Sequence, residues 1–215
     1  MNIHLNQPVL TAGAPLDRCR AAAILIHGRG GAPVQMIDLA RTLDVPGVAY
    51  IAPSAANQTW YPYRFIEPIA RNQPYLDYAL EAYQARVQEI LAHGVPLRRL
   101  VLIGFSQGAC LTAEYAVRYA ARYGGIVAFT GGLIGPPGTT WRYPGRFDGT
   151  PVLFTGAEKD VWIPFWRMRE SVEVFSQMGA QIETHFYPGS SHEITESECV
   201  AARTILYKVI EEVGR

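Results

Sequence analysis

The sequence feature that most constrains the fold is the stretch at residues 100–110, which reads LVLIGFSQGAC. Its first four residues are apolar, which is typical of a strand buried on both faces, and the segment from Gly104 to Gly108 then interrupts the run. Beyond Gly108, apolar residues recur at helical spacing, which indicates a helix packed on a sheet. The stretch therefore predicts a strand, a tight turn that carries Ser106, and a helix.

This setting gives a chemical meaning to the G-x-S-x-G pattern around Ser106. Glycines permit a sharp, strained turn that lifts the serine hydroxyl above the edge of the sheet, and the helix start adds unpaired N–H groups beside it. The alternative is a glycine-rich turn in which the serine only caps the helix. A catalytic role requires a base and an acid from elsewhere in the chain.

Length and charge restrict the class of protein. The 215 residues fit a single domain, residues 1–215, that is long enough to bury its own core. The 19 basic and 19 acidic side chains are scattered along the chain and cancel, which disfavours a nucleic acid or an anionic membrane as a partner. No apolar run approaches the length of a membrane span, and the N-terminus lacks the pattern of a signal peptide.

Apolar runs that end at glycine or proline alternate with stretches of helical spacing. We expect strands at residues 21–26, 48–52, 100–103, 126–130, 151–156 and 181–187, and helices at residues 34–43, 75–93, 109–119, 164–178 and 196–213. This alternation predicts an α/β fold with a mostly parallel central sheet and helices on both faces. Ligand sites of such sheets lie beyond the carboxyl ends of the strands.

The base that would activate the serine is expected to be a histidine, because its pKa lies near neutral pH. His192 follows the strand at residues 181–187 in a loop of small residues on the correct edge, and we interpret it as the base. His4 lies in the N-terminal tail and His93 at a helix end, where surface or capping roles are expected. His185 should face one side of the sheet, and His27 should hold its loop by hydrogen bonds.

The acid that would orient the imidazole is expected after the strand at residues 151–156. Asp160 lies there, on the same edge of the sheet as His192, and Glu158 is its nearest competitor. The alternative for Asp160 is that it only caps the turn before Pro164. Its position in the chain, between the serine and the histidine, favours the catalytic interpretation.

Two backbone N–H groups should stabilise the oxyanion of an acyl-transfer reaction. One is that of Gln107, directly after the serine, and the other is that of Arg29, which lies between Gly28 and Gly30 in the loop after residues 21–26. The glycines of this loop could also suggest phosphate binding, but the lysine of a P-loop is missing.

Residues 53–74 form a long, irregular and aromatic segment, which is uncommon in a compact domain unless it is functional. The aromatic residues expected to line a substrate pocket are Trp60, Tyr61, Tyr63 and Trp162, with Trp60 and Trp162 as the strongest candidates. Phe165 and Trp166 lie in a predicted helix, and we interpret them as core residues.

These motifs resemble those of the phospholipase/carboxylesterase family of α/β-hydrolases, which includes bacterial carboxylesterases and acyl-protein thioesterases. The chain has HGRGG where the family has its HGxG loop, GFSQGA as its nucleophile segment, DVWIP at its acid and GSSHE at its histidine. The resemblance implies an α/β-hydrolase fold, a Ser106–His192–Asp160 triad, and oxyanion donors at Arg29 and Gln107. It also implies an esterase without a metal or organic cofactor, with a small-molecule ester and water as its partners.

Two features separate the chain from the thioesterase branch of that family. Gly31 stands where that branch usually has an acidic residue, and TWYPYRF replaces a different segment, so the resemblance favours a carboxylesterase for small to medium esters. An acyl thioesterase or lysophospholipase of the same fold is the alternative, followed by a binding protein that kept the fold without turnover. The cysteines at 19, 110 and 199 read as reduced thiols of a cytoplasmic protein, and the aromatic loops leave a homodimer open.

Overall fold

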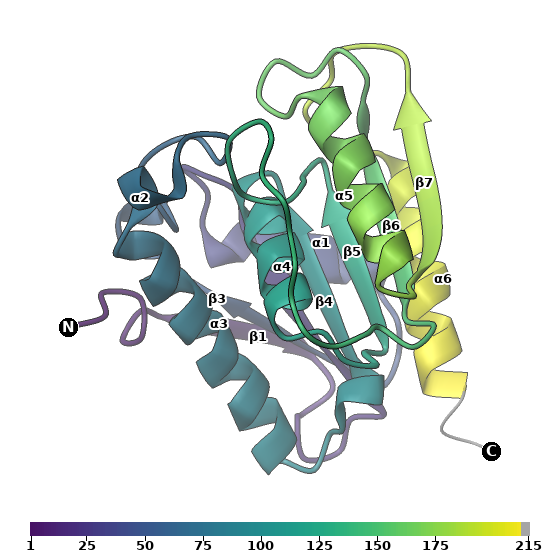
Figure 1. Cartoon of the computed structure of the whole chain (residues 1–215). Helices are drawn as coiled ribbons and strands as arrows, with labels where there is room; N and C mark the ends of the chain where they lie inside the picture. The colour runs from purple at the N-terminus through teal and green to yellow at the C-terminus, as the bar shows by residue number, and fades with distance from the viewer. Residues whose placement is uncertain (212–215) are drawn as a thin grey trace.

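The structure is a computed structural model that describes residues 1–211 of the chain. Its centre is a seven-stranded sheet with the strand order β1-β3-β2-β4-β5-β6-β7 (Figure 1). The strands are β1 (Val9–Gly13), β2 (Ala21–Ile26), β3 (Val48–Pro53), β4 (Leu100–Phe105), β5 (Gly125–Phe129), β6 (Pro151–Ala157) and β7 (Gln181–Tyr187). All neighbouring strands pair in parallel except β1, which pairs antiparallel with β3.

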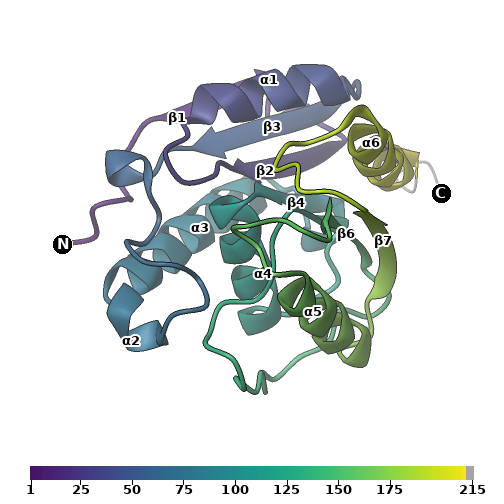
Figure 2. The same ribbon diagram turned by 90° about the horizontal axis from the view of Figure 1, so that it is seen from above.

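The helices cover both faces of this sheet. Seen from above, α1 (Pro33–Leu43) and α6 (Glu196–Glu211) lie on one face, and α3 (Tyr75–Ala92), α4 (Gln107–Arg118) and α5 (Phe165–Gln177) lie on the other (Figure 2). The connections contain a short helix α2 (Ile69–Asn72) and two 3-10 turns, η1 (Ala56–Gln58) and η2 (Leu97–Arg99). Within residues 1–211, no helix is both long and apolar enough to span a membrane.

The central strands are the best buried part of the chain. Every residue of β2 and β3 is buried, as is every residue of β4 up to Gly104, because helices cover both of their faces. In the register between β2 and β4, Ile26 lies opposite Gly104. This pairing places the glycine loop that follows β2 directly beside the turn that follows β4.

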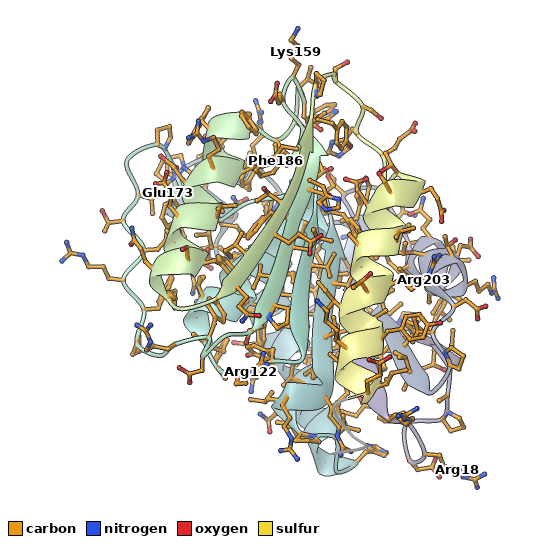
Figure 3. The ribbon with its side chains drawn as sticks, turned by 90° about the vertical axis from the view of Figure 1, so that its right-hand side faces the viewer. Arg18, Arg122, Lys159, Glu173, Phe186 and Arg203 are labelled. Atoms are coloured by element: carbon orange, nitrogen blue, oxygen red, sulfur yellow. The ribbon has the colours of Figure 1, made fainter. Side chains whose placement is uncertain are left out.

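The far edge of the sheet is more open. Strand β7 contains only exposed and half-buried residues, and its Phe186 packs edge-on against Phe165 of α5 with 5.1 Å between ring centroids. Figure 3 views this edge and shows Lys159 at one end of the molecule and Arg18 at the opposite end. The loop that follows β7 therefore begins at the end of a partly exposed strand.

The expected α/β fold is confirmed, because the six predicted strands and five predicted helices all occur with small shifts at their ends. The last two residues of the helix expected at 196–213 lie outside the described residues. Strand β1 was not predicted, because an edge strand exposed on both sides carries no apolar run. The expectation of an N-terminal tail is wrong for His4, whose ring is buried with 4% of the residue exposed.

Candidate active site

Ser106 occupies the turn between β4 and α4 in a strained backbone conformation, with φ 53° and ψ −118°. A positive φ is rare for a residue with a side chain, and here the surrounding contacts enforce it. A Cβ atom on Gly104 would lie 2.3 Å from the Gly108 carbonyl oxygen, and one on Gly108 would lie 2.1 Å from that of Ile26. Both glycines are therefore required sterically, and the turn packs directly against the end of β2.

The three residues expected to form a triad lie within hydrogen-bond distance of one another. The Ser106 hydroxyl donates to Nε2 of His192 over 2.8 Å, and Nδ1–H of His192 donates to Oδ2 of Asp160 over 2.6 Å. This arrangement lets the imidazole accept the serine proton while a carboxylate holds its tautomer. The spacing is that of a nucleophile, a base and an orienting acid.

The buried carboxylate of Asp160 has a second set of partners. Its Oδ1 accepts the backbone N–H groups of Trp162 and Ile163 over 2.7 and 2.8 Å, which fixes the side chain and closes the turn after β6. Asp160 thus caps the turn, as the alternative interpretation proposed, and also contacts His192. Glu158, the competing acid, is exposed at the surface.

The loop that carries His192 is tied to the end of β6 by main-chain bonds. The N–H of Glu158 donates to the Tyr187 carbonyl over 3.0 Å, and that of Lys159 donates to the Gly189 carbonyl over 2.8 Å. The imidazole itself packs against Phe105, with 5.3 Å between ring centroids. Hydrogen bonds between two loops therefore position the acid and the base together.

The glycine loop after β2 is held by the His27 side chain, as expected. Its Nδ1–H donates to the Gly28 carbonyl over 2.7 Å, and its Nε2 accepts the N–H of Ala55 over 3.1 Å. Burial lowers the pKa of His27, which favours the neutral ring that these two bonds require. A Cβ atom on Gly28 would lie 3.3 Å from that of Ser106, so the loop approaches the serine closely.

The N–H groups of Arg29 and Gln107 flank this close approach. Neither finds an acceptor among residues 1–211, whereas the neighbouring N–H groups of Gly30 and Gly31 donate to carbonyls. Gln107 opens α4, where unpaired N–H groups and the positive end of the helix dipole favour an anion. Two free donors beside the serine are the arrangement that an oxyanion requires.

The Gln107 side chain has a structural role that the sequence did not indicate. Its Oε1 accepts the N–H of Trp60 over 3.0 Å, and its Nε2 donates to the Tyr61 carbonyl over 2.8 Å. These bonds attach the aromatic segment, residues 53–74, to the turn that carries Ser106. Because this buried amide has partners for both its oxygen and its nitrogen, it fixes the distance between the aromatic segment and the turn at Ser106.

Trp60 does not line the cavity, which corrects the sequence-based expectation. Only 1% of its surface is exposed, because its indole packs against the rings of His4 and His27 and donates to the His27 carbonyl over 2.9 Å. The imidazole of His4 contacts the Trp60 carbonyl over 3.1 Å and accepts the N–H of Ala56 over 3.0 Å. Burial lowers the pKa of His4 as well. Trp60 thus forms the wall behind the glycine loop.

A cavity of about 340 Å³ opens beside Ser106 and His192. In addition to those two residues and to Arg29 and Gln107, it is lined by Tyr61, Arg64, Phe65, Cys110, Trp162 and Ile163. Tyr61 and Trp162 were expected here. Tyr63 was also expected, but it lies outside the cavity, 45% exposed, with the Arg71 guanidinium 4.2 Å from its ring centroid.

Four of the residues that line the cavity were not predicted from the sequence. For three of them the sequence contained a pattern that could have indicated their position. Cys110 follows Ser106 by four residues on a helix, which places both on one face. Arg64 and Phe65 belong to the aromatic segment already singled out. Ile163 had no signal of its own. On α5, the core interpretation of Trp166 is wrong because that residue is 41% exposed.

The floor of the cavity is uncharged. Burial raises the pKa of the Cys110 thiol to about 12 and raises that of the Tyr61 phenol well above its usual value, so both stay protonated. Neither group acts as a second nucleophile in this state. Within residues 1–211, no group of three or more His, Cys, Asp or Glu side chains is placed to hold a metal ion.

The parallel sheet, the strained serine turn after β4 and the Ser106, Asp160, His192 order along the chain define an α/β-hydrolase. The sequence model of the phospholipase/carboxylesterase family matches residues 11–210. The chain belongs to that family.

Individual relatives agree with this assignment. A solved phospholipase/carboxylesterase from Dyadobacter fermentans is 40% identical, with 96% of this chain and 99% of that one covered and a TM-score of 0.91. A probable carboxylesterase of Oryza sativa subsp. japonica is 28% identical over 120 residues, which is 56% of this chain and 45% of the relative. Acyl-protein thioesterase 1 of Candida albicans is 25% identical over 122 residues, 55% of this chain and 53% of the relative. The chain thus spans about half the length of these curated relatives.

Proposed function

We propose that this protein is a serine carboxylesterase that hydrolyses small to medium carboxylic esters. The observation that carries the proposal is the hydrogen-bonded chain from Ser106 through His192 to Asp160 beside a cavity. A turn that merely caps a helix needs neither a base nor a buried acid. The family membership and the 40% identical phospholipase/carboxylesterase support the same class of reaction.

The first stage forms an acyl-enzyme. Ser106 Oγ attacks the ester carbonyl while His192 Nε2 takes the hydroxyl proton, and Asp160 stabilises the imidazolium. The tetrahedral intermediate collapses, the carbon–oxygen bond to the alcohol breaks, and the alcohol leaves with the proton from His192. Water then attacks the acyl-enzyme with His192 again as the base, which releases the carboxylic acid and restores Ser106.

We assign the stabilisation of the negative charge that develops on the carbonyl oxygen to the backbone N–H groups of Arg29 and Gln107. Because both donors lack an acceptor within residues 1–211, they are free to bind this oxygen without first breaking a protein hydrogen bond. Loss of one oxyanion donor costs about 3 to 4 kcal/mol in the barrier of comparable enzymes. The glycine loop therefore contributes to the rate as well as to the shape of the site.

The size of the cavity supports a compact substrate. About 340 Å³ lies near the lower end of the range of roughly 300 to 1,000 Å³ found for small-molecule sites. The relatives named acyl-protein thioesterase 1 favour an acyl thioesterase as the second candidate. A long acyl chain would need to extend beyond this cavity, which favours the small-ester proposal.

Hydrolysis of p-nitrophenyl acetate, butyrate and palmitate by wild type and Ser106→Ala tests the proposal. We expect the wild type to prefer the short chains and the variant to lose about 10⁴-fold to 10⁶-fold in kcat. Ser176→Ala, which changes an exposed serine on α5, is the matched control and should retain full activity. Equal rates in wild type and Ser106→Ala would contradict the proposal, and preference for palmitate or for a matched thioester would favour the second candidate.

We infer a cytoplasmic location from cysteine usage, since all three cysteines are free thiols. The homodimer expected from the aromatic loops stays a prediction, and sedimentation of the purified protein tests it. Trp162 is 60% exposed at the mouth of the cavity, so a dimer formed through this surface would change access to the site.

A further inference from the structure

We propose that the rim of the cavity is a carboxylate-binding subsite formed by Arg29 and Arg64. The preferred substrate would then be an ester whose acyl or alcohol part carries a second, ionised carboxyl group. This inference rests on the proposed esterase function and specifies its class of substrate. It follows from the charge, the anchoring and the partners of the two arginines.

Arg29 places a fixed positive charge beside the oxyanion donors. Its two terminal nitrogens donate to the carbonyls of Pro62 and Tyr63, both over 2.7 Å, and its guanidinium carbon lies 5.9 Å from the Tyr61 ring centroid. Carbonyl acceptors orient the guanidinium but do not neutralise it. No carboxylate within residues 1–211 forms an ion pair with Arg29.

Arg64 places a second positive charge on the same cavity. It donates to the Trp162 carbonyl over 3.2 Å, which links the aromatic segment to the turn after Asp160. It too has no carboxylate partner in the part of the chain that the structure describes. Arg71, seven residues further along the same segment but outside the cavity, is paired with Glu67 over 3.0 Å.

Nothing charged in the lining opposes these two arginines. Asp160, the candidate acid of the site, does not line the cavity and is already bound by the His192 ring and by two backbone N–H groups. The floor is made of the neutral Tyr61 and Cys110. A cavity with a neutral floor and a cationic rim fits a ligand with an apolar part and an anionic end, and guanidinium groups match the planar geometry of a carboxylate.

Two matched pairs of esters test this assignment on both sides of the scissile bond. Mono-4-nitrophenyl glutarate is compared with 4-nitrophenyl 5-methylhexanoate, and 4-acetoxybenzoate with 4-isopropylphenyl acetate, so that an isopropyl group replaces the carboxylate. The readout is the ratio of kcat/KM within each pair, measured for wild type and Arg64→Met. The same ratio is measured for Arg29→Met and Arg64→Lys. Arg18→Met is the remote control, because Arg18 lies at the opposite end of the molecule from Lys159, the residue before Asp160 (Figure 3).

We expect the anionic member to be preferred in at least one pair, and Arg64→Met to lower that ratio about tenfold. Arg64→Lys should retain part of the preference, Arg18→Met should leave it unchanged, and raising NaCl from 20 to 500 mM should reduce it. An unchanged ratio in Arg64→Met for both pairs would overturn the subsite while leaving Ser106-dependent hydrolysis of the neutral esters, and hence the proposed function, intact.

A binding measurement decides the case in which no ester is hydrolysed. Titration of the folded wild type and Arg64→Met with benzoate and with benzamide separates charge from shape. Benzoate binding that is weakened about tenfold in the variant, with benzamide binding unaffected, supports the subsite even if the esterase proposal fails. Equal affinity for benzoate in both proteins, or much tighter binding of phenyl phosphate than of benzoate, would overturn the carboxylate assignment.

Discussion

The two halves of the candidate site are built in different ways. Ser106 and the glycine loop follow β4 and β2, central strands whose faces are covered by helices, and at Gly104 and Gly108 backbone atoms occupy the space that a Cβ atom would need. Asp160 and His192 follow β6 and β7 at the more open edge of the sheet. The first half combines tight steric packing at Gly104 and Gly108 with the hydrogen bonds of His27, whereas the second half depends on hydrogen bonds between two loops.

Because of this difference, we expect substitutions in the two halves to change different properties, namely stability in one and the reaction rate in the other. In the packed half, an added atom has no space, so the folded state itself becomes less stable. In the hydrogen-bonded half, a side chain can be replaced without a clash, so the main loss is in the reaction.

Asp160→Asn is expected to cost about 10⁴-fold in kcat with little loss of stability. The amide oxygen can still accept the N–H groups of Trp162 and Ile163, so the turn should persist. The amide nitrogen would then face Nδ1 of His192 as a donor, which forces the tautomer that cannot take the serine proton. Steady-state kinetics and thermal unfolding of the same preparation measure the two effects.

Glu158→Gln is the matched control, because it makes the same chemical change two residues away on an exposed side chain. It should alter kcat by less than about twofold. A loss in Glu158→Gln as large as that in Asp160→Asn would mean that the loop, rather than the Asp160 contact with His192, sets the rate.

Gly108→Ala tests the packed half and is expected to lower the free energy of unfolding by at least about 3 kcal/mol. The added Cβ would lie 2.1 Å from the Ile26 carbonyl oxygen and 2.6 Å from that of His27, and backbone atoms cannot move aside cheaply. Gly138→Ala is the control, since its φ of +81° is strained for alanine but its surroundings are open. It should cost roughly 1 to 2 kcal/mol in urea-induced unfolding. Equal costs would contradict the packing argument.

Acidification should lower the free energy of unfolding through two buried histidines of the packed half. Burial lowers the pKa of His4 and His27 in the folded protein, so below about pH 6.5 the unfolded chain binds protons that the folded chain does not. The free energy of unfolding should therefore fall as the pH drops from 7 towards 5, by about 1.4 kcal/mol for each unit of pKa lowering. Urea unfolding of wild type and His4→Asn measures it, with a shallower fall expected in the variant. The same slope in both proteins would rule out His4 as a source.

The elements that carry the chemistry were predictable because their signals are local. A strand, a glycine turn and a helix around Ser106, and single polar residues after two later strands, can be recognised within about ten residues of sequence. Parallel strands then bring the loops to one edge of the sheet, which is why the pairing of Asp160 with His192 follows from topology.

The packing behind the cavity was not predictable in the same way. Trp60 resembles a loop aromatic that is open to substrate, but His4 covers it from 56 residues away in the sequence. Strand β1, which brings the N-terminal segment to this side of the sheet, contains no apolar run from which it could be predicted. Long-range packing of a single ring decides whether an aromatic residue lines a pocket or supports one, and periodicity does not carry that information.

The buried His4 makes residues 2–4 a structural support for the candidate active site. Asn2 donates to the Tyr78 carbonyl of α3 over 2.8 Å, and His4 then holds the segment at Ala56 and Trp60 that Gln107 attaches to the nucleophile turn. A change to Asn2 or His4 would therefore act on the turn at Ser106 through the aromatic segment, although neither residue lines the cavity.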